Sequence, residues 1–260
     1  MASSPDLVRV THQDGVSTIL FNRPDALNSV NLAMAQALAA TAEALPGWDS
    51  RAIVLRGAGP AFMAGGDIPE MAKAVDRAAT VDELVSAAHR FSLALARAPQ
   101  PTVAVIHGAA AGYGLSLAVS CDFTLCADDA KLSLGYRRLG ASCDGGPSFV
   151  LPRLVGAARA ADLLLRRDRI PVEEALRIGL IGETAPAAQL DARLGALLTS
   201  LLANAPQAAA EVKRLLRPPV EDFARALEAE RLAFRALAAT PQFAEGLAAF
   251  LEKREPDFRR

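Results

Sequence analysis

The sequence has no excess of charge of one sign. Its 260 residues include 28 basic and 29 acidic side chains, which gives a net charge of −1. This balance predicts neither the basic patch that binds nucleic acid nor a cationic face for a membrane surface. Nucleic acid and membranes are therefore not expected as partners.

Cysteine and histidine are too sparse for a disulfide framework or a metal site. The three cysteines are an odd number, and the start of the chain, MASSPDLVRV, lacks a charged segment followed by an apolar one. These features predict no export signal, no disulfides and a cytoplasmic location. The histidines His12, His89 and His107 are scattered, and Cys121-x4-Cys126 has no second pair, so we expect no metal.

What the sequence has in quantity is apolar side chains. They make up 52% of the chain, enough for a sizeable core. The longest apolar run, Thr102 to Val119, is interrupted by His107, by glycines and by Ser116. It therefore predicts a buried strand followed by a turn and a helix, not a membrane span.

Strand-like and helix-like segments alternate along the first half of the chain. Asp14-Gly15 between two β-type runs predicts a hairpin, and Asn31 is placed to cap a helix that ends near Leu45. Strands at 51–56, 102–107 and 123–126, separated by helices, predict a largely parallel sheet. No strand is predicted after about Gly156. The helical segments expected there are 158–166, 172–178, 187–203, 206–216 and 221–238.

Two glycine-containing loops each follow a predicted strand and begin a helix. They are AGGD at 64–67 and AGYG at 111–114. The first amides of a helix have no partner within it and suit an anion or a developing oxyanion. Either loop alone is explained by a tight turn, and neither matches a phosphate-binding glycine motif. Two such loops in one sheet can converge to form an oxyanion hole.

Six segments, in this order, resemble the signature blocks of the crotonase, or enoyl-CoA hydratase/isomerase, superfamily. They are FNRPDALNS (21–29), GAGPAFMAGGDI (57–68), HGAAAGYGLSLAVSCDFTLCADDAKL (107–132), LGASCDGGPSFVLPRLVG (139–156), DRIPVEEALRIGLI (168–181) and FLEKREPDF (250–258). The resemblance implies an α/β fold, a crotonase-like spiral of ββα turns over residues 1–190. It also implies a helical C-terminal region, 191–260, for oligomerisation and active-site cover, and a homo-oligomer that is a trimer or hexamer.

The resemblance further implies an acyl-CoA substrate, with coenzyme A present only as part of the thioester and no separate cofactor. The backbone amides of Gly66 and Tyr113 would bind the thioester oxygen. The implied contacts to coenzyme A are Ala26, Leu27, Ala64, Gly65, Asp67, Ile68 and Lys253, the last of these to a phosphate bound by a neighbouring subunit.

This chain lacks the acidic residues that ordinary hydratases of the family use. Family hydratases use two glutamates, and the matching positions here hold Ser116 and Tyr136, neither of which supplies a carboxylate near neutral pH. Asp144 stands where related isomerases have their single functional aspartate; the alternative is a turn residue. We therefore expect an isomerase that moves a double bond, with Asp144 as base and then acid.

Two other functions, one of them non-catalytic, fit the same residues. Dehalogenases of this superfamily have a nucleophilic aspartate at the Asp144 position, an aromatic residue at the Tyr136 position and a base matching His89. Such a hydrolase or dehalogenase would form an aspartyl ester. A partly exposed helical His89 and a Tyr136 that packs or lines the pocket are the simpler alternatives. A third reading is a non-catalytic acyl-CoA-binding relative.

Overall fold

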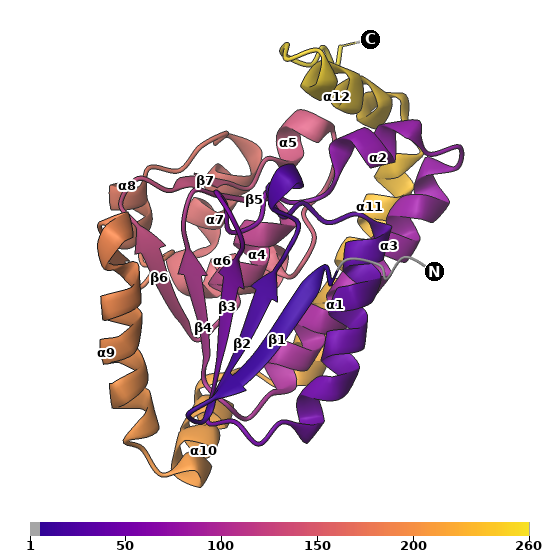
Figure 1. Ribbon diagram of the computed structural model, residues 1–260. Coiled ribbons are helices and arrows are strands. Elements are labelled where there is room, and N and C mark those ends of the chain that lie inside the picture. The colour runs from indigo at the N-terminus through magenta and orange to yellow at the C-terminus, as the bar shows by residue number, and fades with distance from the viewer. Residues whose placement is uncertain (1–5, 260) are drawn as a thin grey trace.

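A six-stranded sheet flanked by helices organises the protein, a computed structural model that describes residues 6–259 (Figure 1). Part of the segment on which the export-signal prediction depends, residues 1–5, lies outside the described residues. The sheet order is β1-β2-β3-β4-β6-β8, and β5 and β7 form a small second sheet. The strands are β1 (Val8–Gln13), β2 (Val16–Phe21), β3 (Ala52–Gly57), β4 (Thr102–Ile106), β5 (Ala109–Ala111), β6 (Phe123–Ala127), β7 (Lys131–Ser133) and β8 (Glu183–Ala185).

Helices follow the strands and make up almost all of the last third of the chain. They are α1 (Leu32–Ala44), α2 (Ile68–Lys73), α3 (Arg77–Arg97), α4 (Tyr113–Val119), α5 (Tyr136–Leu139), α6 (Pro147–Val155), α7 (Ala157–Leu165), α8 (Val172–Arg177), α9 (Leu190–Leu202), α10 (Pro206–Leu216), α11 (Val220–Ala238) and α12 (Pro241–Leu251).

Local signals in the sequence account for the first elements. Asp14 and Gly15 both have positive φ, 51° and 77°, and join the antiparallel strands β1 and β2 as the predicted hairpin. The side chain of Asn31 accepts a hydrogen bond from the amide of Met34 and caps α1, as predicted. From β2 onward, each neighbouring pair of strands in the large sheet is parallel, which confirms the predicted crossover topology.

The prediction that no strand follows Gly156 is wrong. The segment Glu183–Ala185 is β8, which pairs parallel with β6 at the edge of the sheet. This strand has three residues, of which one is buried. It is too short to show the alternation of apolar and polar side chains that predicts a strand. The short strands β5 and β7 have the same length and were not predicted either.

The C-terminal helices lie around the sheet, with α9 at the left and α10 below the strands in Figure 1. Helix α9 packs on one face of the sheet through Leu190 and Leu194, against a cluster that includes Val103 and Leu125. Helix α11 lies along α3, and α12 contacts α2 and α5. The last two helices therefore return to the end of the molecule where the parallel strands lead into their loops. Within residues 6–259, no helix combines the length and apolarity needed to cross a membrane.

Candidate active site

The two glycine loops predicted to form an oxyanion hole lie against each other. Met63 and Ala110 form a parallel bridge between them. Gly65 has a φ of +88°, and a Cβ there would lie 2.9 Å from the carbonyl oxygen of Ala111. Only glycine combines this backbone conformation with such a close approach. The bridge and the close contact bring the start of α2 next to the start of α4.

The amides of Gly66 and Tyr113 are both available to a ligand. Within residues 6–259 the amide of Gly66 has no backbone acceptor, although its neighbour Asp67 donates to Val30 O at 3.0 Å. Tyr113 is the first residue of α4, and amides at that position have no acceptor within their own helix. Two unpaired donors thus lie on adjoining loops, which is the arrangement that an oxyanion hole requires.

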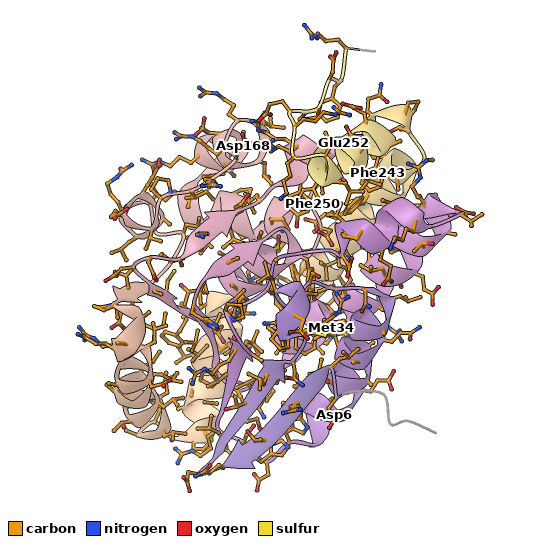
Figure 2. The ribbon with its side chains drawn as sticks, turned by 45° about the horizontal axis from the view of Figure 1, so that its top comes forward. Asp6, Met34, Asp168, Phe243, Phe250 and Glu252 are labelled. Atoms are coloured by element: carbon orange, nitrogen blue, oxygen red, sulfur yellow. The ribbon has the colours of Figure 1, made fainter. Side chains whose placement is uncertain are left out.

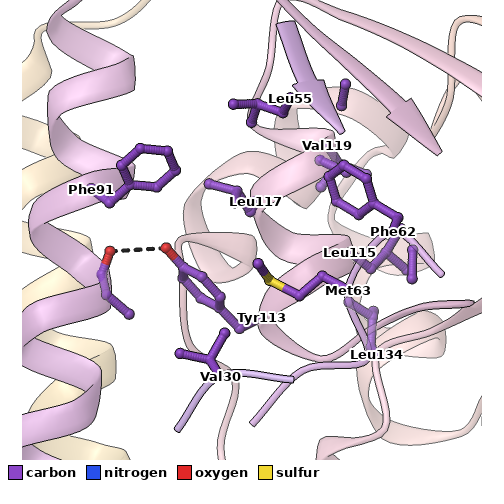
Figure 3. Close-up of a cluster of buried hydrophobic side chains, with 14 of the residues drawn as sticks. Val30, Leu55, Phe62, Met63, Phe91, Tyr113, Leu115, Leu117, Val119 and Leu134 are labelled. Carbon is purple, nitrogen blue, oxygen red and sulfur yellow. Dashed lines mark hydrogen bonds between the residues drawn. The ribbon is translucent and has the colours of Figure 1, made fainter. Parts of the chain in front are cut away.

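The side chain of Tyr113 fixes its amide in place. Its ring lies in the core beside Met63 and Val30, and its hydroxyl is hydrogen-bonded to α3 (Figure 3). The hydroxyl donates to Ala88 O at 2.9 Å and lies 3.1 Å from Ser92 Oγ. Burial raises the pKa of Tyr113, so the phenol stays protonated and remains a donor.

A cavity of about 820 Å³ lies beside these two loops. Gly66, Tyr113, Tyr136 and Asp144 all line it. Part of its lining is apolar and comes from α2, α3, α11 and α12: Ile68, Met71, Leu84, Val85, Phe234 and Phe250. In Figure 2, Phe243 and Phe250 both extend from α12. This apolar part of the cavity suits the hydrocarbon part of a small ligand.

The residues predicted to contact coenzyme A are divided between two pockets. Six of them line the main cavity: Ala26, Leu27, Ala64, Gly65, Asp67 and Ile68. Asp67 also accepts from Arg23 at 2.6 Å and caps α2, so its carboxylate is already engaged. Lys253 instead lines an adjoining pocket of about 390 Å³, which shares Ser133, Arg138 and Phe250 with the main cavity. The structure therefore does not place Lys253 with the other six.

Asp144 is a buried carboxylate that borders the main cavity. Its side chain is 4% exposed, and burial raises its pKa to about 6, an effect partly offset by the Tyr136 hydroxyl. The next residue, Gly145, has a φ of +84°, and a Cβ there would lie 2.7 Å from the Tyr113 ring. The glycine therefore lets the Asp144 loop pack directly on Tyr113, which also lines the cavity.

Ser116 and Tyr136, at the positions of the hydratase glutamates, contact each other. Ser116 Oγ lies 2.9 Å from the Tyr136 hydroxyl and 3.0 Å from Gly112 O. The Tyr136 hydroxyl donates to the carbonyl oxygen of Asp144 at 2.9 Å, and burial raises its pKa well above its usual value. Tyr136 borders the cavity, but Ser116 is not among its described lining residues. These two positions therefore supply no carboxylate, and of the two only Tyr136 borders the cavity.

His89 lies behind the Asp144 loop and outside the described lining of the cavity. It is only 6% exposed because α11 covers that face of α3, so the alternative of a partly exposed helical residue is wrong. Its Nε2 accepts a hydrogen bond from the amide of Gly145 at 2.9 Å. Desolvation lowers the pKa of His89 to about 4, so the ring is neutral near neutral pH.

Glu230 was not predicted, although it contacts the same loop. It lies on α11, is 5% exposed and accepts from the amides of Gly146 at 2.7 Å and Ser148 at 2.9 Å. Burial raises its pKa to about 7, against the effect of these hydrogen bonds. The sequence contained one indication that Glu230 is buried. Its spacing places it on the same helical face as the apolar residues Leu227 and Phe234.

Two other chemistries find no support among the described residues. Burial raises the pKa of Cys143 to about 12, so its thiol remains protonated and poorly nucleophilic. No group of three or more histidine, cysteine or acidic side chains within residues 6–259 could hold a metal ion.

Comparison with known proteins agrees with this geometry. The model of the enoyl-CoA hydratase/isomerase family matches residues 11–260. The chain belongs to this family. A solved enoyl-CoA hydratase from Mycobacterium avium subsp. paratuberculosis has a TM-score of 0.88 and 31% identity, covering 98% of this chain and 99% of that one. The protein therefore has the crotonase fold.

Relatives within the enoyl-CoA hydratase/isomerase family have different names. A Bacillus subtilis protein named as an enoyl-CoA hydratase/isomerase is 33% identical over 98% of this chain and 99% of its own. An Arthrobacter 4-chlorobenzoyl coenzyme A dehalogenase is 34% identical over 97% of this chain and 94% of its own. A Streptococcus mutans trans-2-decenoyl-[acyl-carrier-protein] isomerase is 31% identical over 94% and 95%. Members of this family therefore differ in the reaction that their names assign to them.

Proposed function

We propose that this protein moves a double bond along the acyl chain of an enoyl-CoA thioester, with Asp144 as the single acid–base group. The observation that supports this most concerns the two buried carboxylates that border the cavity. Asp67 is paired with Arg23 and caps α2, which leaves Asp144 as the carboxylate beside the two unpaired backbone amides. The positions that would carry the two hydratase glutamates hold Ser116 and Tyr136. A relative named as an isomerase adds support.

The reaction needs one proton and no net change in charge. The Asp144 carboxylate removes a proton from the carbon next to the thioester of a 3-enoyl substrate. The electron pair moves onto the thioester oxygen, and the amides of Gly66 and Tyr113 stabilise the resulting dienolate. Protonated Asp144 then returns the proton two carbons further along, which gives the conjugated 2-enoyl product. A pKa of about 6 keeps both protonation states within reach near neutral pH.

A hydrolase or dehalogenase with Asp144 as nucleophile is the alternative. The dehalogenase relative and the presence of Tyr136 and His89 favour it. Its base would have to take a proton from water, whereas His89 Nε2 already accepts from the amide of Gly145 and lies outside the described lining of the cavity. We therefore place the isomerase first. A non-catalytic acyl-CoA-binding relative would retain the cavity but show no turnover.

The test is turnover of a 3-enoyl-CoA, followed by the ultraviolet absorbance of the conjugated product. Asp144→Asn keeps the shape of the side chain but removes the proton acceptor, so we expect kcat to fall at least about 10²-fold. KM should change little, because the amides that bind the thioester remain. Asp129→Asn, the same change in an exposed turn, is the control and should leave kcat unchanged. Full activity of Asp144→Asn would refute the isomerase and the nucleophilic hydrolase together.

We also propose that the protein works as a homotrimer or hexamer. Exposed apolar side chains on the C-terminal helices support this, since monomers rarely leave large apolar patches in water. In the same proposal, residues 1–190 form the catalytic core, and residues 191–260 supply helices for assembly and for covering the cavity.

A further inference from the structure

Side chains from two helices hold the turn that follows Asp144. The amide of Gly145 donates to His89 Nε2 on α3 at 2.9 Å. The amides of Gly146 and Ser148 donate to the carboxylate of Glu230 on α11 at 2.7 and 2.9 Å. Three amides at the end of this loop are therefore paired with side chains that are more than fifty residues away in the sequence.

Glu230 also replaces the cap that α6 lacks. The residue before this helix is Gly146, which has no side chain to cap it. Ser148 donates to Glu230 through its hydroxyl as well as its amide, so the carboxylate meets the first turn of α6 with several donors. A carboxylate is favourable at the positive end of a helix. Its removal would leave buried amides without partners.

His89 has the same kind of role on the other side of the turn. An imidazole whose Nε2 accepts a hydrogen bond carries its proton on Nδ1. Burial lowers the pKa of this ring, and the backbone of Leu227 acts in the opposite direction, so α11 lies next to the imidazole. The lone pair that a general base would need is directed at Gly145, not at the cavity.

We propose that His89 and Glu230 are positioning residues, which hold the backbone of residues 144–148 from opposite helices and thereby direct the Asp144 carboxylate at the substrate. Neither residue transfers a proton. This inference rests on the proposed function of Asp144.

His89 and Glu230 together form a clamp on the backbone of residues 144–148, and the glycines of this turn explain why it is needed. Gly145 and Gly146 have φ of 84° and 103°, a region that glycine enters easily and also leaves easily. Without external partners, this turn would sample several conformations, and the carboxylate would move with it. A displacement of about 1 Å at a reacting group can cost about 10²-fold in rate.

Two substitutions of His89 separate positioning from proton transfer. His89→Ala removes the acceptor and should lower kcat for a 3-enoyl-CoA by about 10 to 10²-fold, with KM nearly unchanged. His89→Gln places an amide oxygen where Nε2 lies but cannot act as a base, and it should restore most of the activity. Arg90→Ala, on the exposed side of the same helix, is the control. If His89→Gln were as impaired as His89→Ala, at equal melting temperatures, the positioning role would be overturned in favour of proton transfer.

Glu230 is tested by replacing one of its two acceptor oxygens. Glu230→Gln keeps the volume but directs the NH2 group of the side-chain amide at a backbone donor. We therefore expect kcat to fall about tenfold or more, with KM nearly unchanged. The matched control is Glu221→Gln, at the exposed start of α11. If Glu230→Gln had the kcat of the wild type, the positioning role of Glu230 would be overturned.

A measurement without substrate keeps this inference separate from the proposed function. Hydrogen exchange of the Gly145 amide should be faster in His89→Ala, and that of the Gly146 amide faster in Glu230→Gln, than in the wild type. If the wild type turned over no enoyl-CoA, the proposed function would fail, and the exchange rates alone would decide the clamp. Unchanged exchange at both amides would overturn it.

Discussion

At the scale of the residue, two buried carboxylates near one loop differ in what they face. Asp144 borders the cavity, and Glu230 meets the amides of Gly146 and Ser148. Burial raises the pKa of both, to about 6 and about 7, because water is excluded from each. Only the one that faces the cavity can exchange a proton with a substrate, so position, not acidity, separates their roles.

The raised pKa of Asp144 predicts the pH dependence of the reaction. The base must be ionised, and its folded-state pKa of about 6 lies above the ordinary 3.8 of an aspartate. We therefore expect kcat/KM for a 3-enoyl-CoA to fall about tenfold for each pH unit below the pKa, since that is how the ionised fraction falls. His89, neutral above about pH 4, should add no step near neutral pH. Constant kcat/KM at pH values well below 6, with the fold intact by circular dichroism, would contradict this assignment.

At the scale of the element, the site depends on glycines that let loops approach each other. Gly65 places the first loop against Ala111, and Gly145 places the Asp144 loop against the Tyr113 ring. Each has a positive φ and a neighbour within 3 Å of any added Cβ. The helices then present their free amides to one cavity because the loops before them are in contact.

Gly145→Ala should damage both stability and catalysis. Its Cβ would overlap the Tyr113 ring at 2.7 Å, and the left-handed backbone is unfavourable for alanine. We expect a loss of about 2 kcal/mol or more in the free energy of unfolding, measured by urea denaturation, and a lower kcat. Gly195→Ala in α9 is the control, because its Cβ meets nothing within 4 Å and alanine favours a helix. That change should stabilise the protein by about 0.5–1 kcal/mol. If the two substitutions had equal effects on stability, the close contact with Tyr113 would not be the reason that position 145 requires glycine.

At the scale of the whole molecule, the C-terminal helices leave apolar side chains in water. Leu215 and Leu216 on α10 are 71% and 80% exposed, and Val212 is exposed beside them. Val212 and Leu216 line a second cavity, of about 720 Å³, bordered by residues of α6 and α9. A surface of this kind on a single chain favours burial against other copies.

Light scattering should therefore report three or six copies at micromolar concentration. The double substitution Leu215→Glu with Leu216→Glu places charges on the exposed apolar surface and should shift the mass toward the monomer. Arg193→Glu on the exposed face of α9 introduces charge elsewhere and serves as the control. A wild-type protein that is monomeric at these concentrations would contradict the proposed assembly.

The sequence alone determined the elements whose signals are local. The Asp14-Gly15 turn, the Asn31 cap and the glycine loops before α2 and α4 depend on backbone preferences of a few adjacent residues. The same local character explains why the family could be identified from six short segments. Strands of three residues, such as β8, were missed because their pairing comes from β6 and not from their own pattern.

Only the tertiary structure decided which side chains meet the Asp144 loop. His89 and Glu230 are contributed by α3 and α11, far apart in the chain, and the packing of these helices on each other brings them together. Along the sequence His89 is consistent with either a base or a surface residue, and Glu230 with a solvated acid. The direction of a lone pair and the burial of a carboxylate depend on neighbours in space, and a local sequence pattern does not contain them.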